Sequence, residues 1–252
     1  MAHSLLRTPG GGERHFRWRG SEISRTENLS DAVFGFAITL LVVSTEVPAT
    51  FAELKQLLHG FLPFGVCVLV FGLIWHAHYT FFRRFGLEDR TTMLLNALLL
   101  FVVVFFLFPL KFLASLLLAL ATGTPQTAAR LNNADELLAI YSGGYLAIFL
   151  LFALLYHHAL RQRENLELTP AEVVLTRMSL ALNWVQVLVA ALALLGALLF
   201  STHGLVGFVY FLIGPLSYAV GAYHGRRLQA ALAPPPPPPS PESEPPAEAK
   251  AP

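Results

Sequence analysis

Long apolar stretches alternate with short polar segments along the chain, and this pattern predicts membrane-spanning helices. A span needs about 20 apolar residues, because the hydrocarbon core is ~30 Å thick and a helix rises ~1.5 Å per residue. The sequence lacks the alternating ten-residue segments of a membrane β-barrel, which leaves helices as the spanning element. We therefore predict an all-α integral membrane protein with six transmembrane helices, at about 29–48, 57–82, 92–120, 136–160, 179–201 and 204–223.

Composition agrees with this pattern and excludes several classes of protein. Hydrophobic residues make up 55% of the 252 residues and charged residues only 13%, whereas soluble domains carry about 25% charged residues. The chain is therefore neither an ordinary soluble globule nor a nucleic-acid binder with a basic face. Its single cysteine, Cys67, excludes an internal disulfide and a cysteine-based zinc site.

The distribution of positive charge predicts the orientation in the membrane. Six spans place both termini on one side, and that side carries 14 of the 17 Lys and Arg residues. By the positive-inside rule, both termini lie in the cytoplasm. Alanine-rich helices and a proline-rich tail are typical of GC-rich bacterial genomes, so we expect a multi-pass protein of the cell (plasma) membrane.

Local signals refine the organisation. Pro109 and Lys111 lie inside the third span, which we expect to end near Pro109 and to continue as an interfacial helix. Thr169 is a candidate N-cap for a helix that Pro170 starts. An unbroken proline run at 234–239 predicts a disordered, partly polyproline II tail. We divide the chain into a cytoplasmic N-terminal segment (1–24), a six-helix transmembrane domain (25–225) and a cytoplasmic tail (226–252).

Polar residues inside the apolar blocks are the candidates for function, because a charge at a helix centre costs ~2.5–3.5 kcal/mol on insertion scales. Asp31 follows Ser30 at the start of the first span, where both suit a helix N-cap, and Arg25 is close enough in sequence to pair with Asp31. Asn96 in the third span is a candidate for hydrogen bonds between helices. The sequence contains none of the common hydrolase, metalloprotease or phosphate-loop motifs, so we expect no enzyme activity, no cofactor and no resident metal.

One stripe of the first span has two possible roles. Phe36, Leu40, Val43 and Val47 follow the spacing of a single helix face, and Thr39 lies beside it. The stripe suits a packing seam between helices. It equally suits a pore lining, because narrow apolar constrictions gate ions by dewetting.

The segment Arg25–Val42, RTENLSDAVFGFAITLLV, resembles the signature of the transmembrane protein 175 family of potassium channels, in its bacterial six-span branch. Trp75 and His78 resemble the W-x-x-H pattern that closes the second span in that family. The resemblance covers roughly residues 22–225.

This resemblance implies a fold and a function. The bacterial members are homotetramers in which the first helix of each subunit lines a central pore, and bulky aliphatic side chains form the constriction. Potassium ions and the lipid bilayer are then the expected partners, with no nucleic acid. By position, the pore constriction falls on Phe36, Thr39, Leu40 and Val43. A structural polar network falls on Arg25, Ser30, Asp31, Trp75 and His78.

Two departures from the family pattern and two alternative functions accompany this interpretation. Leu29 replaces the phenylalanine of the motif, and Phe36 replaces an aliphatic residue at the narrowest ring. Four phenyl rings there could narrow the pore, rotate aside or present their negative faces to a cation.

The first alternative function is proton or metal-ion transport through the histidines, which are His76, His78, His157 and His158. The second is a non-conducting membrane scaffold whose tail recruits a partner.

Overall fold

The computed structural model describes residues 15–20, 22–43, 48–59, 61–122, 134–200 and 204–232. Every regular element within these ranges is helical, as the sequence predicts. The elements are α1 (Arg25–Val43), α2 (Phe51–His59), α3 (Phe61–Phe85), α4 (Arg90–Thr122), α6 (Ala134–Arg161), α7 (Pro170–Leu199), the 3-10 helix η1 (Leu205–Leu212) and α8 (Ile213–Leu232).

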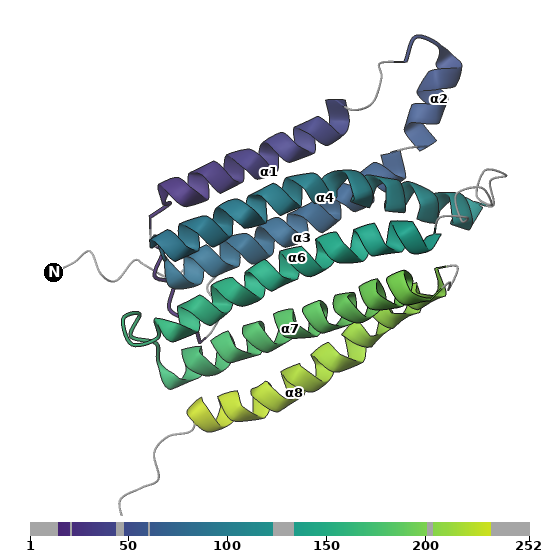
Figure 1. The fold of residues 1–252 in the computed structure, drawn as a ribbon. Coiled ribbons are helices and arrows are strands. Elements are labelled where there is room, and N and C mark those ends of the chain that lie inside the picture. The colour runs from purple at the N-terminus through teal and green to yellow at the C-terminus, as the bar shows by residue number, and fades with distance from the viewer. Residues whose placement is uncertain are drawn as a thin grey trace, which may run out of the picture.

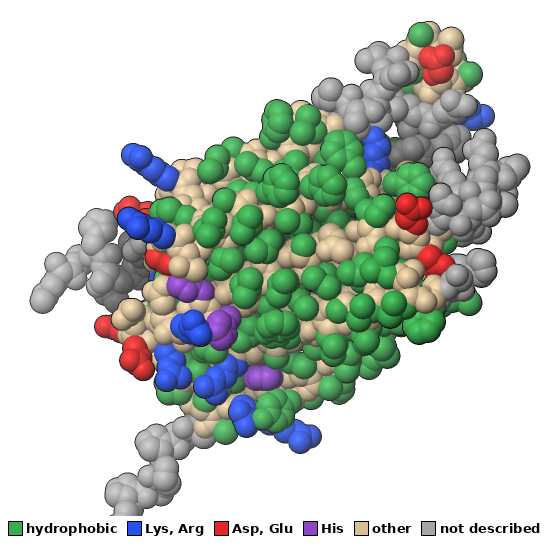
Figure 2. Space-filling view, viewed as in Figure 1, with side chains coloured by type: hydrophobic (Ala, Val, Ile, Leu, Met, Phe, Trp, Pro, Cys, Tyr) green, Lys and Arg blue, Asp and Glu red, His purple; other side chains and the backbone are tan. Residues whose placement is uncertain are grey.

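The six long helices lie side by side, and each runs opposite to the one before it (Figure 1). α1 packs on α3 and α4 at one edge of this bundle, and α6 and α7 lead to α8 at the other edge. The N-terminal ends of α1, α4 and α7 therefore meet the C-terminal ends of α3, α6 and α8 at one end of the bundle. Blue Lys and Arg side chains gather at that end in Figure 2, whereas the face between the ends is mostly apolar.

Within the described ranges, five helices are long and apolar enough to cross a membrane. They are α3, α4 as far as Leu116, α6, α7, and η1 together with α8. α1 has 19 residues, and the predicted outer part of its span, residues 44–47, lies outside the described residues. The chain is a multi-pass membrane protein.

The start of the second span differs from the prediction. Residues 57–59 belong to the separate short helix α2, and α3 begins at Phe61. α2 has its own start signal, because the Glu53 carboxylate accepts hydrogen bonds from the backbone N–H groups of Ala49 and Thr50, at 2.7 and 3.3 Å. Pro63 lies in the first turn of α3, where a backbone N–H has no partner within the helix, so the N–H that proline lacks costs no hydrogen bond.

Further boundaries differ at Pro109 and near the chain end. α4 continues through Pro109 to Thr122, in agreement with the prediction that the chain stays helical beyond this proline. The apolar span itself extends to Leu116, so the prediction that the span ends near Pro109 is wrong. Proline inside a membrane helix is tolerated because neighbouring groups satisfy the freed carbonyl. α8 continues to Leu232, beyond the predicted domain boundary at 225. The predicted start of α7 is confirmed, because Thr169 is its N-cap and Pro170 its first residue.

The core is aromatic and lies among α3, α4 and α6. Phe81 has almost no exposed surface and meets Tyr156 edge to face, with ring centres 5.2 Å apart. Phe106 packs where Gly144 has no side chain, because a Cβ at Gly144 would collide with its ring. The sole cysteine, Cys67, is buried in the same core. This core fixes α3 and α4, the two helices on which α1 rests.

Candidate functional site

The start of α1 is defined by a capping box. Ser24 Oγ accepts a hydrogen bond from the Glu27 N–H at 3.0 Å, and the Glu27 carboxylate accepts one from the Ser24 N–H at 2.9 Å. The other carboxylate oxygen of Glu27 lies 4.0 Å from Arg83 Nε, on the last turn of α3. Both side chains of this pair are largely buried. The first turn of α1 is thereby attached to the end of α3.

A buried chain of hydrogen bonds joins α1, α4 and α3. Asn96 Nδ2 donates to Ser30 Oγ at 2.9 Å, and Asn96 Oδ1 lies 2.7 Å from His78 Nε2. Ser30 in turn donates to the Thr26 carbonyl at 2.7 Å. All three bridging side chains are at most 2% exposed. Since Asn96 uses its amide toward Ser30, its carbonyl oxygen accepts from the His78 ring, which fixes the proton on Nε2.

Asp31 forms a second, more exposed contact between α1 and α3. Its Oδ1 accepts a hydrogen bond from Trp75 Nε1 at 2.8 Å. Arg25 lies at the exposed start of α1, and among the contacts of the described residues none joins it to Asp31. The structure thus places Ser30, Asp31, Trp75 and His78 at the α1–α3 junction and leaves Arg25 apart.

The predicted pore face of α1 points away from the bundle. Phe36 is 64% exposed, whereas its neighbours Phe34 and Ala37 are buried against the rest of the molecule at 3% and 0%. Thr39 is exposed as well, and its hydroxyl donates to the Gly35 carbonyl one turn earlier at 2.9 Å. Leu40 is half-buried. Val43 belongs to α1, but its side chain lies outside those that the structure describes.

An open groove runs beside this face, between α1 and α3. Its volume is about 430 Å³, and its lining is mostly apolar. Gly35 and Gly72 both line it, and a Cβ added at either would have no described neighbour within 4 Å. The groove is lined by Asp31, Phe34, Gly35, Ile38, Phe71, Gly72 and Trp75.

The histidines of the alternative transport hypothesis lie in separate environments. His78 is in the buried network, whereas His158 Nε2 is 2.9 Å from Asp89 Oδ2, at the start of α4. Burial raises the pKa of the Asp89 carboxyl, but hydrogen bonds from Thr92 and the neighbouring His158 outweigh it, so that the pKa lies below its ordinary value. Within the described ranges, no three His, Cys, Asp or Glu side chains form a group that could hold a metal ion.

A further polar cluster was missed by the sequence analysis. Arg19, in the segment before α1, forms an ion pair with Glu172 on α7 at 2.8 Å. The capping-box pattern of Thr169 and Glu172 predicts the start of α7. It does not predict the ion pair of Glu172 with Arg19, which lies 153 positions earlier in the sequence.

Comparisons with known proteins place this geometry in context. Residues 25–106 match the family model of the endosomal/lysosomal potassium channel TMEM175. The chain is 36% identical over 242 residues to a potassium channel of Marivirga tractuosa, an alignment that covers 90% of this chain and 98% of that protein. It is 32% identical over 147 residues to a potassium channel of Chamaesiphon minutus, covering 55% of this chain and 66% of the other. A crystal structure of a variant of the potassium channel MtTMEM175, in complex with a nanobody–MBP fusion protein, is similar with a TM-score of 0.78 and 36% identity, over 86% of this chain and 99% of that one.

Proposed function

Because this chain belongs to the TMEM175 family of potassium channels, we propose that four copies of it form a potassium-selective leak channel with a hydrophobic neck lined by α1. The relatives confirm the sequence interpretation that the chain is a potassium channel of this family and not an enzyme. The tetramer, the neck and the leak-type conduction are the proposal.

The outward face of α1 is the observation that carries the proposal. Phe36 exposes a large ring there, and Asp31, Gly35 and Thr39 on the same outward side are polar or small. Lipid-facing positions disfavour a carboxylate, which normally faces protein or water in a membrane. A face that mixes one bulky apolar ring with polar and small residues suits a water-filled path and the helices that surround it.

The groove between α1 and α3 supports assembly from several copies. Helices associate in membranes by close packing, and small residues allow their backbones to approach. Gly35 and Gly72 offer such an approach at the groove floor. A neighbouring copy seated in this groove would place its own α1 beside this one, around a common axis.

The proposed neck controls conduction through its width and its polarity. Apolar constrictions gate by dewetting, and a cation that crosses them loses part of its water shell. Phe36 forms the narrowest ring of side chains, with Thr39, Leu40 and Val43 further along α1. The Thr39 hydroxyl, already donating within α1, presents oxygen lone pairs to a passing cation. The negative faces of the phenyl rings attract a cation in the same place.

The same proposal includes location and orientation. Lys and Arg side chains gather at the end of the bundle where α1, α4 and α7 begin and α3, α6 and α8 end (Figure 2). By the positive-inside rule that end, with both termini, faces the cytoplasm of a cell whose plasma membrane holds the channel. The channel domain extends over residues 25–225, with a tail that follows.

A flux assay tests this function. Purified protein is reconstituted in liposomes, and potassium flux is measured against sodium and proton gradients. We expect passive, potassium-selective flux, and in Phe36→Ala a larger flux with weaker discrimination against sodium. Phe208→Ala is the matched control, since Phe208 on η1 has the same 64% exposure and lies at the opposite edge of the bundle.

Each alternative has its own outcome in this assay. Flux with steep pH dependence that is lost on changing His76 or His157, and not Phe36, would refute the neck in favour of histidine-based transport. Absence of flux in the wild type and in Phe36→Ala would refute conduction and leave the scaffold function. Equal effects of Phe36→Ala and Phe208→Ala would place the constriction elsewhere.

A further inference from the structure

We propose that Arg19 and Glu172 are positioning residues for the pore: through the segment Phe16–Gly20, here named the N-terminal strap, they hold the first turn of α1 and thereby set the width of the neck. The inference rests on the proposed function, in which α1 lines the pore. Neither residue lies on the pore face of α1, so both act through that helix.

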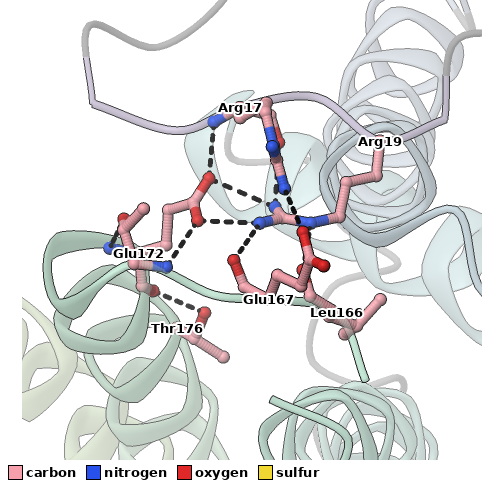
Figure 3. A network of polar contacts seen from close by, with 7 residues as sticks. Arg17, Arg19, Leu166, Glu167, Glu172 and Thr176 are labelled. Atoms are coloured by element: carbon pink, nitrogen blue, oxygen red, sulfur yellow. Dashed lines mark hydrogen bonds and ion pairs between the residues drawn. The ribbon is translucent and has the colours of Figure 1, made fainter. Parts of the chain in front are cut away.

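The Arg19–Glu172 pair is saturated with hydrogen bonds (Figure 3). Arg19 Nη1 and Nη2 each donate to one carboxylate oxygen of Glu172, at 3.1 and 2.8 Å. The remaining donors of the guanidinium reach three backbone carbonyls, those of Arg17, Leu166 and Glu167, at 3.0, 2.7 and 3.1 Å. A guanidinium has five N–H groups, so every one is used.

The carboxylate of Glu172 also accepts several hydrogen bonds. Besides the two bonds from Arg19, it accepts the Arg17 backbone N–H at 2.7 Å and the Thr169 N–H at 2.9 Å. Its side chain is 2% exposed, and that of Arg19 is 12% exposed. A bidentate pair of this kind fixes orientation as well as distance. Removing one partner would leave a buried charge uncompensated. The pair therefore fastens the strap rigidly to the start of α7 and to the α6–α7 loop.

The strap is also held to the end of α3. The Arg83 carbonyl accepts the backbone N–H groups of Arg19 and Gly20, at 3.1 and 3.2 Å, and Arg83 Nη1 donates to the Gly20 carbonyl at 2.8 Å. A Cβ at Gly20 would lie 2.7 Å from the Phe82 carbonyl oxygen, so only glycine allows this approach. Phe16 is 5% exposed and packs edge to face on Phe85, with ring centres 5.6 Å apart.

α1 begins directly after the strap. Ser24, which caps α1, follows Gly20 by only four positions, and Arg83 contacts both the strap and Glu27 of α1. Arg83 therefore links the first turn of α1 to the strap. Phe36 lies about 16 Å along the helix from Arg25, at ~1.5 Å per residue. A tilt of about 5° around the first turn would move Phe36 by roughly 1.4 Å, a change comparable to the radius of a cation.

Arg17 supplies a matched control within the strap. Its side chain is 63% exposed and lies 3.7 Å from Glu167, which is 83% exposed. It contributes to the cluster through its backbone, because Glu172 accepts its N–H and its carbonyl accepts from Arg19. Arg17→Gln and Arg19→Gln thus remove the same charge two residues apart, but only Arg19→Gln removes the buried pair.

The experiment measures the potassium-to-sodium permeability ratio of the full-length channel in lipid bilayers under bi-ionic conditions. This ratio does not depend on how many channels assemble, so a merely structural defect lowers the current and leaves the ratio unchanged. We expect Arg19→Gln and Glu172→Gln each to lower the ratio at least threefold. Arg17→Gln should keep the wild-type ratio, and the double variant Arg19→Gln/Glu172→Gln should fall no further than either single variant.

Several outcomes would overturn the inference. If Arg19→Gln has the wild-type permeability ratio, whether or not its current is reduced, the pair is purely structural. If the ratio falls equally in Arg17→Gln, the effect is one of charge and not of the buried pair. If Arg19→Gln does not assemble, Arg19→Lys, which keeps the charge with fewer donors, must show a ratio between those of the wild type and Glu172→Gln. A wild-type ratio in Arg19→Lys then refutes the proposal. Phe36→Ala is measured in parallel: no effect there refutes the neck itself, whereas an effect there without one at Arg19 refutes only the strap.

Discussion

Asn96 is the bridge of the buried network, and its removal should destabilise the channel measurably. Asn96→Ala deletes the hydrogen bond to Ser30 Oγ at 2.9 Å and the one from His78 Nε2 at 2.7 Å. Hydrogen bonds between membrane helices average ~0.6 kcal/mol, because the unfolded chain in the membrane also finds partners. The two bonds alone would therefore contribute about 1 kcal/mol.

The larger part of the cost comes from the histidine left behind. His78 is 2% exposed and packs between Phe34 and Phe82, with ring centres 5.7 and 4.6 Å away, so its ring is closed off from bulk water. A buried donor without a partner costs ~1–3 kcal/mol. We therefore expect Asn96→Ala to lower the free energy of unfolding by roughly 2–4 kcal/mol.

Reversible denaturant unfolding in mixed micelles, followed by tryptophan fluorescence, gives this quantity. Asn28→Ala is the control: Asn28 is an exposed asparagine on the same helix as Ser30, and its loss should change stability by less than ~0.5 kcal/mol. Adding His78→Phe to Asn96→Ala removes the unpaired donor and should recover part of the loss. The reasoning fails if Asn96→Ala is as stable as Asn28→Ala, or if the double variant is less stable than Asn96→Ala alone.

Two contacts nearer the surface give further predictions. Asp31→Ala removes the acceptor for Trp75 Nε1 and should reduce the fraction of the proposed tetramer in size-exclusion chromatography, whereas Asp31→Asn keeps an acceptor oxygen and should retain that fraction. Equal fractions in the wild type and Asp31→Ala would contradict this. Because the pKa of Asp89 in the folded protein is below its ordinary 3.8, its ionised form stabilises the fold above that pH, and this contribution is lost as pH falls through the folded pKa. The melting-temperature advantage of the wild type over Asp89→Asn should therefore shrink between pH 5 and pH 3, and an advantage that grows on acidification would refute the assignment.

The lengths of the apolar stretches were sufficient to predict the long helices. A membrane span must satisfy its backbone hydrogen bonds internally, and it needs about 20 apolar residues. Thr169 and Pro170 predicted the start of α7 as local capping signals. The short helix α2 was missed because Leu57 and Leu58 were counted with the second span, although His59 and Gly60 separate them from Phe61. The extension of the α4 span past Pro109 was also missed, since neighbouring helices decide whether a proline is tolerated inside a membrane span.

The long-range partners could not be derived from spacing. Ser30, Asp31, Trp75 and His78 were chosen from one motif and one pattern. In the structure Asp31 and Trp75 bond to each other directly, whereas Ser30 and His78 are joined through Asn96 on α4. Arg19 gave no signal at all: it lies in a short polar segment, and its partner Glu172 is known only once α7 is placed. Sequence identifies residues that are costly to bury, and the fold decides which of them meet.

The way α1 is held explains why polar contacts concentrate at one half of it. In the proposed channel α1 faces both protein and a water-filled path, so it has little apolar surface to bury. Lipid supplies no hydrophobic drive for helix association. Directional bonds must then fix its position, and they lie at Glu27, Ser30 and Asp31, within the first two turns. Beyond Asp31 the contacts of the described side chains with neighbouring helices are apolar, through Phe34 and Ala37. Phe36 therefore lies just past the last rigid anchor, where a small change at the first turn is carried along the helix to the proposed neck.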